Sequence, residues 1–446
     1  MFKMSEVLKD KIKSRKAKIG IIGLGYIGLP LAVEFARKGY QTLGIDIDLS
    51  KIKLIQQKKN YIKDILNKDF LFVINNHLFK ATSSYDKINE MDVIFICVPT
   101  PVTKNKTPDI SSIMDSVEEI SKKLKRNQLI ILKSTSFPGT TEEYILPVLE
   151  KKGLKVGKDF YLAFSPERID PGNKFYNTTN TPIVVGGVTR RCTELAAQIS
   201  QEVATKVYQL SSPKVAEMEK LLENIFRSVN IALLNELARL CARMGGINIW
   251  EVIEAAATKP FGFMPFYPGP GIGGHCIQID PYYLDWLAKS YDFQTKFIEL
   301  AAEINEDMPF YVRDLVLKVI ANSSMKIQDA NVLIIGVSFK KDVDDSRNSP
   351  SIKLLELLTN EGVQNLYYND PFIKSLRINE KIFRSQPLTE KLLKESDCAV
   401  IVTDHSSYDY EWIVTYSKKV VDTRNATKKI RNNRAKITLL GNSVIE

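Results

Sequence analysis

The sequence predicts an α/β protein in which two mostly parallel sheets are separated along the chain by a long helix. Residues 19–46 read as a buried strand, a glycine turn, a helix and a second strand. Residues 331–370 repeat the order strand, loop, helix and strand, but without the glycine turn. Residues 212–244 carry the longest helical periodicity, between a Ser-Pro start and a Gly-Gly stop. These three patterns together define the fold class.

Length and composition set the broad class of the protein. A chain of 446 residues is too long for one hydrophobic core, so we expect three domains, at 1–208, 209–325 and 326–446. With 44% hydrophobic and 26% charged residues the chain resembles soluble globular proteins. No apolar run approaches the roughly 20 residues that span a bilayer, so no membrane insertion is expected. Five widely spaced cysteines without a CxxC pair argue against disulfides and against a metal site, and favour a reducing, cytoplasmic setting.

The formal charge of +10 is concentrated near the N-terminus. The first eighteen residues hold seven Lys or Arg against two acids. Val7, Leu8 and Ile12 could form the apolar face of a short helix there, with the basic residues on a solvated face. The remaining lysines form no basic stripe with interleaved aromatic residues, so we expect no nucleic-acid partner. A small anionic substrate would suit this charge equally well.

The first strand–turn–helix unit carries a dinucleotide-binding pattern. Gly23, Gly25 and Gly28 stand between the strand and the helix, and Asp46 ends the next strand. In such a Rossmann-like unit the first glycine permits a tight turn, the second admits the pyrophosphate and the third lets the helix pack on the strand. Asp46 would accept hydrogen bonds from the adenosine ribose and repel a 2′-phosphate, which favours NAD over NADP. A packed turn followed by an incidental acid is the alternative.

Further cofactor contacts are expected around this turn and at two later strand ends. Tyr26 and Ile27 lie within the turn itself. Thr100 and Thr135 follow two apolar strands, and ligands of parallel sheets bind beyond the carboxyl ends of the strands. Cys97 lies inside the first of these strands, so we expect it to be a buried core thiol.

Two polar groups could belong either to a site or to an ordinary surface. Glu167 and Arg168 follow a strand in a polar loop, where they could form a surface ion pair or carry chemistry. Lys220, Asn224 and Arg227 are spaced so that they share one face of the long helix. That face could be solvated, or it could line a site.

The loop GPGIGGHCIQIDP at 269–281 brings a thiol to a flexible, glycine-rich segment. Cys276 could be a small apolar filler, as free cysteines often are. It could also be a nucleophile, whose thiolate would need a positive neighbour such as His275 or Lys220. Oxidation of an alcohol to an acid requires a tetrahedral adduct at the aldehyde stage, and a thiol can supply it. An NAD site in the same chain therefore gives this cysteine a specific use.

The second α/β unit keeps Gly336 but lacks the glycine cradle. Lys340 and Arg424 follow two of its strands, where they could bind an anionic ligand. A structural domain with a charged rim is the alternative.

Taken together, these residues resemble the UDP-glucose/GDP-mannose dehydrogenase family over nearly the whole chain. The markers occur in order as GLGYIGLPLA, CVPTP, KSTSFPGTT, FSPERIDPG, EMEKLLENIFRSVNIALLNELA, GPGIGGHCIQIDP and SFKKDVDDSR. The resemblance implies a Rossmann-like NAD domain, a helical central domain and a smaller Rossmann-like UDP-binding domain. It also suggests a homo-oligomer, a dimer or larger, built on the long helix.

The resemblance also implies roles for single residues. Cys276 would form a thiohemiacetal and then a thioester, while Lys220 and Asn224 stabilise the developing oxyanion. Glu167 and Asp280 would serve as general bases and in hydrolysis.

Binding roles follow from the same resemblance. Thr135 would hold a water molecule, and Arg347 would reach the cofactor. The residues expected to bind the UDP-sugar are Glu167, Arg168, Lys220, Asn224, Arg227, Lys259, Tyr267, Gly273, Lys340 and Arg424.

Within the family, ATKPFGF, YPGPGIGGHC and the SPERxxPG loop resemble the UDP-N-acetylglucosamine 6-dehydrogenases of surface-polysaccharide (O-antigen or capsule) biosynthesis. The implied reaction is an NAD-dependent four-electron oxidation of the sugar C6 hydroxyl to a carboxylate. Gln278 departs from this branch, which usually has proline there, and so bears on substrate preference. UDP-glucose, UDP-N-acetylgalactosamine and UDP-N-acetylmannosamine remain alternative substrates.

Two other functions stay open. A two-electron hydroxyacid dehydrogenase would share the dinucleotide unit and the long helix, but it would leave Cys276 and the second α/β domain without a role. A non-catalytic nucleotide-sugar sensor would be expected to have lost one of the catalytic residues, and all of them are present.

Overall fold

The computed structural model describes residues 3–103, 105–168, 175–176, 179–274, 277, 279–323 and 325–442. The chain forms two compact units. The first comprises Met1–Glu223 and Tyr282–Asp292, and the second comprises Asn224–Pro281 and Phe293–Glu446.

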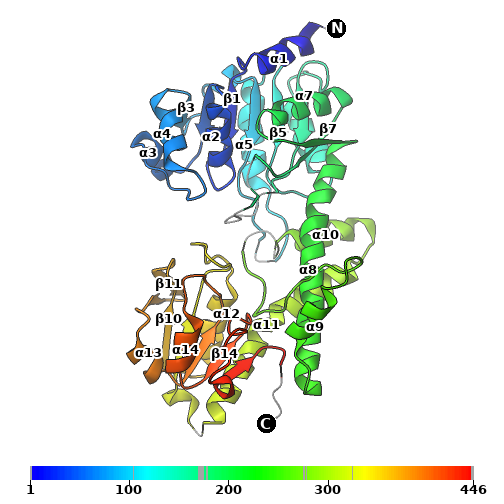
Figure 1. Ribbon diagram of the computed structural model, residues 1–446. Coiled ribbons are helices and arrows are strands. Elements are labelled where there is room, and N and C mark those ends of the chain that lie inside the picture. Colours follow the sequence, from blue (N-terminus) through cyan, green and yellow to red (C-terminus); the bar gives the residue numbers. More distant parts are fainter. Residues whose placement is uncertain are drawn as a thin grey trace. The chain divides into compact units, whose positions relative to one another are not determined.

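The first unit is built on an eight-stranded sheet (Figure 1). Its order is β3-β2-β1-β4-β5-β6-β7-β8, and all neighbours are parallel except β6 and β7. The strands are β1 (Ile19–Ile22), β2 (Thr42–Ile45), β3 (Phe79–Thr82), β4 (Val93–Ile96), β5 (Leu129–Leu132), β6 (Tyr161–Phe164), β7 (Ile183–Gly187) and β8 (Val207–Leu210).

Helices cover both faces of this sheet, which explains why its central strands are almost entirely apolar. Ile21 of β1 belongs to the core under α1, α2, α4 and α7, whereas Ile22 belongs to the opposite core under α5 and α6. The helices are α1 (Lys3–Lys13), α2 (Gly28–Arg37), α3 (Leu49–Gln56), α4 (Asn67–Asn75), η1 (Ile88–Glu90), α5 (Ser111–Lys123), η2 (Thr140–Ile145), α6 (Leu146–Glu150), α7 (Arg190–Gln201) and η3 (Lys289–Tyr291). Cys97 is buried at the end of β4, as predicted.

The N-terminal basic segment forms α1 and packs on the first unit. Leu8 and Ile12 are fully buried, whereas Val7 is 49% exposed, so the predicted apolar face consists of two of the three residues. The Lys11 ammonium pairs with the Asp92 carboxylate at 2.7 Å. The basic face is therefore tied to the unit by at least one ion pair and is not wholly solvated.

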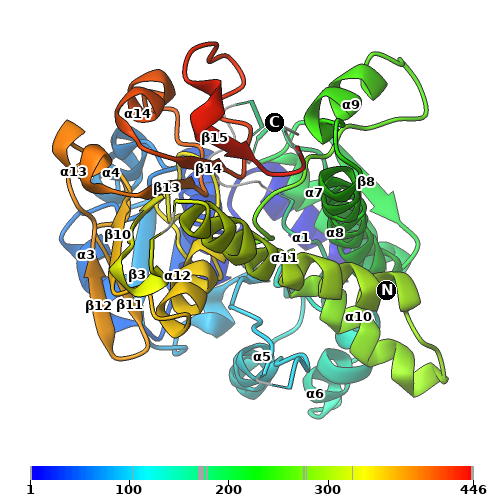
Figure 2. The same ribbon diagram turned by 90° about the horizontal axis from the view of Figure 1, so that it is seen from below.

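The second unit contains a five-stranded parallel sheet in the order β10-β9-β13-β14-β15 and an antiparallel hairpin of β11 and β12. The strands are β9 (Asn331–Ile335), β10 (Asn365–Asn369), β11 (Ser375–Ile378), β12 (Lys381–Arg384), β13 (Cys398–Ile401), β14 (Val420–Asp422) and β15 (Ile437–Leu439). The helices are α9 (Ile249–Ala256), α11 (Lys296–Ala321), η4 (Ile327–Asp329), α12 (Pro350–Asn360), α13 (Glu390–Glu395), α14 (Tyr410–Tyr416) and η5 (Arg434–Lys436). Helices α11 and α12 lie side by side (Figure 2).

Two helices contribute residues to both units. Helix α10 (Asp280–Ala288) is one, and α8 (Pro213–Met244) matches the long helix predicted from periodicity. The Ser212 hydroxyl accepts a hydrogen bond from the Val215 amide at 3.3 Å, which confirms the predicted N-cap. Gly245 and Gly246 end the helix with φ values of 76° and 69°, a backbone region that favours glycine.

The predicted α/β fold class, with two Rossmann-like sheets and a long central helix, is therefore confirmed. Within the described ranges, no helix combines the length and apolar character needed to cross a membrane.

Candidate active site

The glycine turn between β1 and α2 has the geometry that a pyrophosphate requires. Gly23 has a φ of 89°, and a Cβ on it would lie 2.5 Å from the Cys97 carbonyl oxygen. A Cβ on Gly28 would lie 1.7 Å from the Gly23 carbonyl oxygen, so α2 can pack here only on glycine. A Cβ on Gly25 would meet nothing within 4 Å, which leaves the middle of the turn open. Ile27 caps α2 without a side-chain hydrogen bond, so the helix N-terminus suits an anion.

Asp46 lies beside this turn and is only 7% exposed. Its carboxylate accepts hydrogen bonds from the Leu24 amide at 2.7 Å, the Asp48 amide at 2.9 Å and the Lys51 ammonium at 3.0 Å. A carboxylate has about four acceptor positions, so one remains for a ribose hydroxyl. Lys51 was not among the predicted residues, because no spacing rule in the sequence singles it out. The turn and Asp46 together fit the adenosine end of NAD.

The other predicted cofactor residues of the first unit lie around the same sheet edge. Thr100 is buried, and its carbonyl accepts a hydrogen bond from the Tyr283 hydroxyl at 2.6 Å. Thr135 is half-buried just beyond β5, and Tyr26 is 48% exposed in the glycine turn. Strand β4 pairs with β1, and β5 pairs with β4. Thr100 follows β4 and Thr135 follows β5, so both lie beyond the same edge of the sheet as the glycine turn that follows β1.

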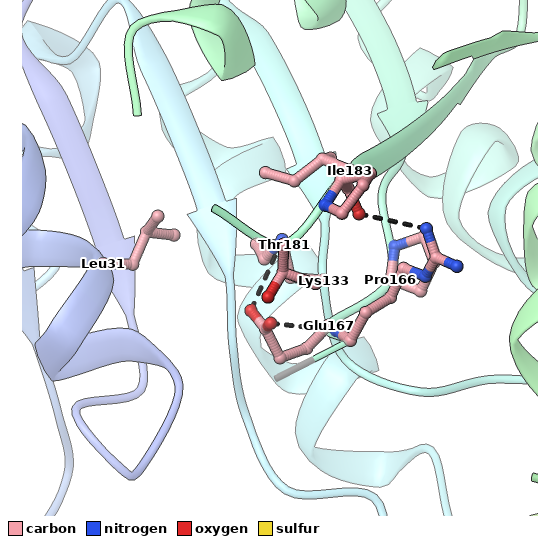
Figure 3. A pocket seen from close by; sticks show the side chains of 8 residues that line it. Leu31, Lys133, Pro166, Glu167, Thr181 and Ile183 are labelled. Atoms are coloured by element: carbon pink, nitrogen blue, oxygen red, sulfur yellow. Dashed lines mark hydrogen bonds and ion pairs between the residues drawn. The ribbon is translucent and has the colours of Figure 1, made fainter. Parts of the chain in front are cut away.

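A small pocket in the first unit contains a buried ion pair (Figure 3). The Lys133 ammonium lies 3.6 Å from Glu167 Oε2, and the two side chains are 4% and 15% exposed. The other Glu167 oxygen accepts a hydrogen bond from the Arg168 amide at 2.9 Å. The pocket is lined by Leu31, Lys133, Pro166, Glu167, Arg168, Thr181, Pro182 and Ile183. Lys133 was not predicted as a site residue, although its position directly after the buried strand β5 could have indicated it.

The polar face of α8 is buried at two of its three predicted positions. Lys220 is 7% exposed, and its ammonium donates to the Glu167 carbonyl oxygen at 2.6 Å. Asn224 is 6% exposed, and its amide donates to the Asp280 carboxylate at 2.5 Å. Arg227 is exposed. A solvated face is therefore the wrong explanation for Lys220 and Asn224, and the structure brings each of them to a predicted catalytic partner.

Cys276, His275 and Gln278 lie outside the described residues, so the expected nucleophile has no described geometry. The glycines before it pack against the second unit's own chain. A Cβ on Gly273 would lie 2.7 Å from Phe339 Cβ, and a Cβ on Gly269 would lie 2.7 Å from the Arg424 guanidinium. These two glycines therefore have a packing role, which the sequence pattern did not reveal.

The remaining predicted residues of the second unit are spread over several segments. Arg424 is half-buried and donates to the Val402 carbonyl oxygen at 2.9 Å. Arg347 pairs with Asp345 at 2.6 Å, and the Lys340 carbonyl accepts from the Ser338 hydroxyl at 2.8 Å. The Tyr267 ring stacks on Trp250 with centroids 5.8 Å apart, and the Lys259 ammonium lies 4.9 Å from the centroid of Phe261. Their predicted ligand roles stay predictions.

In the second sheet, where the glycine cradle is missing, Asp370 binds the backbone amides that follow β9. It follows the second strand of its βαβ unit, as Asp46 does in the first. Its Oδ2 accepts from the Val337 amide at 2.7 Å and the Ser338 amide at 3.0 Å, and lies 3.0 Å from His405 Nε2. Its Oδ1 accepts hydrogen bonds from two further backbone amides, those of Phe372 and Ile373. This carboxylate is fully used inside the protein, so it is not available to a ribose.

His405 also holds the loop that contains Lys340. It is fully buried, and its Nδ1 accepts from the Asp342 amide at 3.0 Å. This bond requires an unprotonated Nδ1, which assigns the proton to Nε2 and so to the bond with Asp370. His405 was not predicted, although its position just after the buried strand β13 was a signal for it.

The comparisons with known proteins agree with this arrangement. Residues 17–209 match the NAD binding domain of the UDP-glucose/GDP-mannose dehydrogenase family, residues 214–307 its central domain and residues 333–429 its UDP binding domain. The resemblance inferred from the seven motifs is confirmed.

Similar proteins cover most of the chain. The UDP-N-acetyl-D-mannosamine dehydrogenase of Pyrococcus horikoshii is 34% identical over 92% of this chain and 96% of its own length. The UDP-N-acetyl-D-glucosamine 6-dehydrogenase of Pseudomonas aeruginosa is 37% identical over 78% of this chain and 81% of its own length. A solved structure of the Pyrococcus horikoshii UDP-D-ManNAc dehydrogenase superposes with a TM-score of 0.86 at 33% identity, covering 95% of this chain and 99% of that one. The chain therefore belongs to the UDP-glucose/GDP-mannose dehydrogenase family and is an NAD-dependent oxidoreductase.

Proposed function

We propose that this protein oxidises the C6 hydroxyl of a UDP-N-acetylhexosamine to a carboxylate, with UDP-N-acetylglucosamine as its substrate. The observation that carries the proposal is the buried polar face of α8. Lys220 and Asn224 lie one turn apart and are bonded to Glu167 and Asp280, respectively. Burial of an ammonium costs free energy unless it is paired with an opposite charge, and the Lys220 ammonium is bonded to a neutral carbonyl oxygen. A buried cation beside a buried amide donor suits the stabilisation of an oxyanion.

Two molecules of NAD, bound one after the other, would supply the acceptors for the two hydrides, and the glycine turn with Asp46 would hold the pyrophosphate and adenosine ribose of each. Thr100 and Thr135 follow neighbouring strand ends, which supports a role for both beside the cofactor. We also assign Arg347 to the cofactor, on family resemblance alone.

The chain's own residues would carry the carbon chemistry. Loss of one hydride and one proton turns the C6 alcohol into an aldehyde, and the Cys276 thiolate then adds to the aldehyde carbon. Loss of a second hydride from this adduct leaves a thioester, and water releases the acid and restores the thiol. Lys220 and Asn224 would stabilise the oxyanion of each tetrahedral species, and Glu167 would accept the proton of the attacking water.

Other polar residues are proposed to bind the UDP-sugar or to assist hydrolysis. Asp280 is buried and accepts from Asn224, so its carboxylate is oriented for proton transfer. Lys340 and Arg424 follow strands of the domain that matches the family's UDP binding domain, which supports a contact with the diphosphate. Glu167, Arg227, Lys259, Tyr267 and Gly273 complete the proposed set.

UDP-N-acetylmannosamine is the second candidate substrate. The Pyrococcus horikoshii relative, which this chain resembles over nearly its whole length, is named a UDP-N-acetyl-D-mannosamine dehydrogenase. The two sugars differ only in the direction of the C2 acetamido group.

We also propose that the protein is a cytoplasmic homo-oligomer that assembles through α8. Large apolar side chains stay exposed at helical spacing along one side of this helix. They are Val215, Met218, Leu222, Phe226, Leu233, Leu237, Leu240 and Met244. An apolar stripe of this length is typical of a subunit interface.

A substrate panel tests the proposal. NADH formation is followed with UDP-N-acetylglucosamine, UDP-N-acetylmannosamine, UDP-N-acetylgalactosamine and UDP-glucose at equal concentration. The proposal expects the highest kcat/KM with UDP-N-acetylglucosamine. A higher kcat/KM with the manno epimer would move the assignment to the second candidate, and activity on UDP-glucose alone would overturn the acetamido class.

A further inference from the structure

The side chain of Arg168 joins three segments of the first unit. Its Nε donates to Glu223 Oε1 at 3.0 Å, and its Nη2 donates to the same oxygen. Its Nη1 donates to the Pro182 carbonyl oxygen at 3.0 Å, and Glu219 Oε1 lies 3.5 Å from Nη2. The loop after β6 is thereby fastened both to α8 and to the residue before β7.

The two acids that hold Arg168, Glu219 and Glu223, are one turn apart on α8. Burial, followed by the interaction of the Glu219 carboxyl as donor with the Glu223 carboxylate, raises the pKa of Glu219 to about 7, against the opposing charges of Arg168 and Lys220. Glu219 Oε2 is buried and makes no hydrogen bond. Glu219 therefore gains or loses its charge around neutral pH.

This fastening acts directly on the proposed catalytic groups. The residue before Arg168 is Glu167, whose carbonyl oxygen accepts a hydrogen bond from the Lys220 ammonium at 2.6 Å. The Arg168 amide also donates to the Glu167 carboxylate at 2.9 Å. On α8, Lys220 directly follows Glu219. An anchored Arg168 side chain thus restrains both the carbonyl and the carboxylate of Glu167.

We propose that Arg168, Glu219 and Glu223 form a clamp that positions Glu167 against Lys220 during catalysis. The proposal rests on the function proposed above, and it makes Arg168 a positioning residue in place of a substrate contact. It also predicts that the clamp responds to pH, because ionisation of Glu219, whose Oε1 lies 3.5 Å from Arg168 Nη2, adds a negative charge that strengthens the hold on the guanidinium beside Lys220.

The test compares Arg168→Lys with Arg190→Lys in the full-length protein. Lysine keeps the charge of Arg168 but cannot form the forked bonds to Glu223 and Pro182. Arg190 forms an exposed ion pair with Glu194 on α7 and serves as the matched control. With NAD and UDP-N-acetylglucosamine, Arg168→Lys should lower kcat by about 10-fold or more while KM changes by less than about 3-fold. Arg190→Lys should leave both parameters unchanged.

Two further measurements distinguish a clamp from a merely structural contact. Hydrogen exchange of the peptide 161–168 should speed up in Arg168→Lys and stay unchanged in Arg190→Lys. Glu219→Gln cannot gain the charge that strengthens the clamp in the wild type, so the ratio of its kcat to that of the wild type should fall by about 3-fold or more between pH 6 and pH 8.

The outcomes separate this proposal from the proposed function. A raised KM with unchanged kcat in Arg168→Lys would make Arg168 a substrate contact and overturn the clamp. Unchanged exchange of the peptide 161–168 would overturn it as well. If the wild type oxidised no UDP-sugar, the proposed function would fail, while the exchange measurement would still decide whether Arg168 holds the loop.

Discussion

Glu217 provides a quantitative test of the packing between α8 and the loop that follows Thr135. This side chain is fully buried, and it accepts hydrogen bonds from the Gly139 amide at 2.7 Å, the Thr141 amide at 2.9 Å and the Thr141 hydroxyl at 2.7 Å. It thus caps the N-terminus of η2. Burial raises the pKa of Glu217 from 4.5 to about 7, and the hydrogen bonds only partly offset this effect.

The sign of the pH dependence follows from this raised pKa. The folded state binds the proton more tightly than the unfolded state, so the stabilisation is complete below about pH 4.5 and is lost as the pH rises towards 7. At about 1.4 kcal/mol per pKa unit, the loss between pH 5.5 and pH 8 is about 2 kcal/mol. Glu217→Gln resembles the protonated side chain and does not titrate.

The assay is thermal unfolding of the wild type and Glu217→Gln at pH 5.5 and pH 8. The Tm of the variant relative to the wild type should rise by about 4–8 °C between the two pH values, given the size of the first unit. Glu236→Gln, which changes an exposed acid on the same helix, should show no such difference. A relative Tm that falls towards pH 8 would refute the reasoning, because it would mean that the three donors stabilise an ionised carboxylate.

Further predictions concern the glycine turn and the second sheet. Gly28→Ala should lower the free energy of unfolding by about 3 kcal/mol or more, since its Cβ would overlap the Gly23 carbonyl. Gly25→Ala should keep the wild-type Tm but bind NAD at least about 10-fold more weakly, as measured by calorimetry. Equal NAD affinity in Gly25→Ala would contradict the assignment of that open space to the pyrophosphate. Burial alone would raise the pKa of Asp370, but the hydrogen bonds from His405 and the backbone outweigh burial and hold that pKa below its usual range. The stability that Asp370 contributes is therefore lost as the pH falls through its folded-state pKa. Asp370→Asn should therefore lower the Tm at pH 7, by a destabilisation of about 1–3 kcal/mol, and less in acid. An equal loss at neutral and acid pH would contradict a role for the charge.

Local patterns in the sequence predicted that the glycine turn and Asp46 lie together, as the structure has them, while their contacts with the cofactor stay predictions. The glycine turn and Asp46 lie within one βαβ unit, so spacing along the chain is enough to bring them together. The position of α8 also follows from helical periodicity, which left open whether the face that carries Lys220 and Asn224 is solvated or buried.

The contacts that the sequence did not reveal join residues that are far apart in the chain. Lys133 forms an ion pair with Glu167, and the two residues follow the neighbouring strands β5 and β6. His405 forms a hydrogen bond with Asp370, and these two residues follow different strands of the second sheet. Register and packing decide such pairs, and no local spacing encodes them. Gly273 shows the same limit, because the need for glycine arises from Phe339 in another segment.

Cys276 is proposed to carry the second of two oxidations, and the amount of NADH formed per sugar consumed tests this role directly. The wild type should form two NADH per UDP-N-acetylglucosamine, with a carboxylate as the product. Cys276→Ala should lose this stoichiometry, because no thiol is left to form the thioester. One NADH per sugar, unchanged in Cys276→Ala, would contradict the account and favour a two-electron dehydrogenase in which the cysteine takes no part.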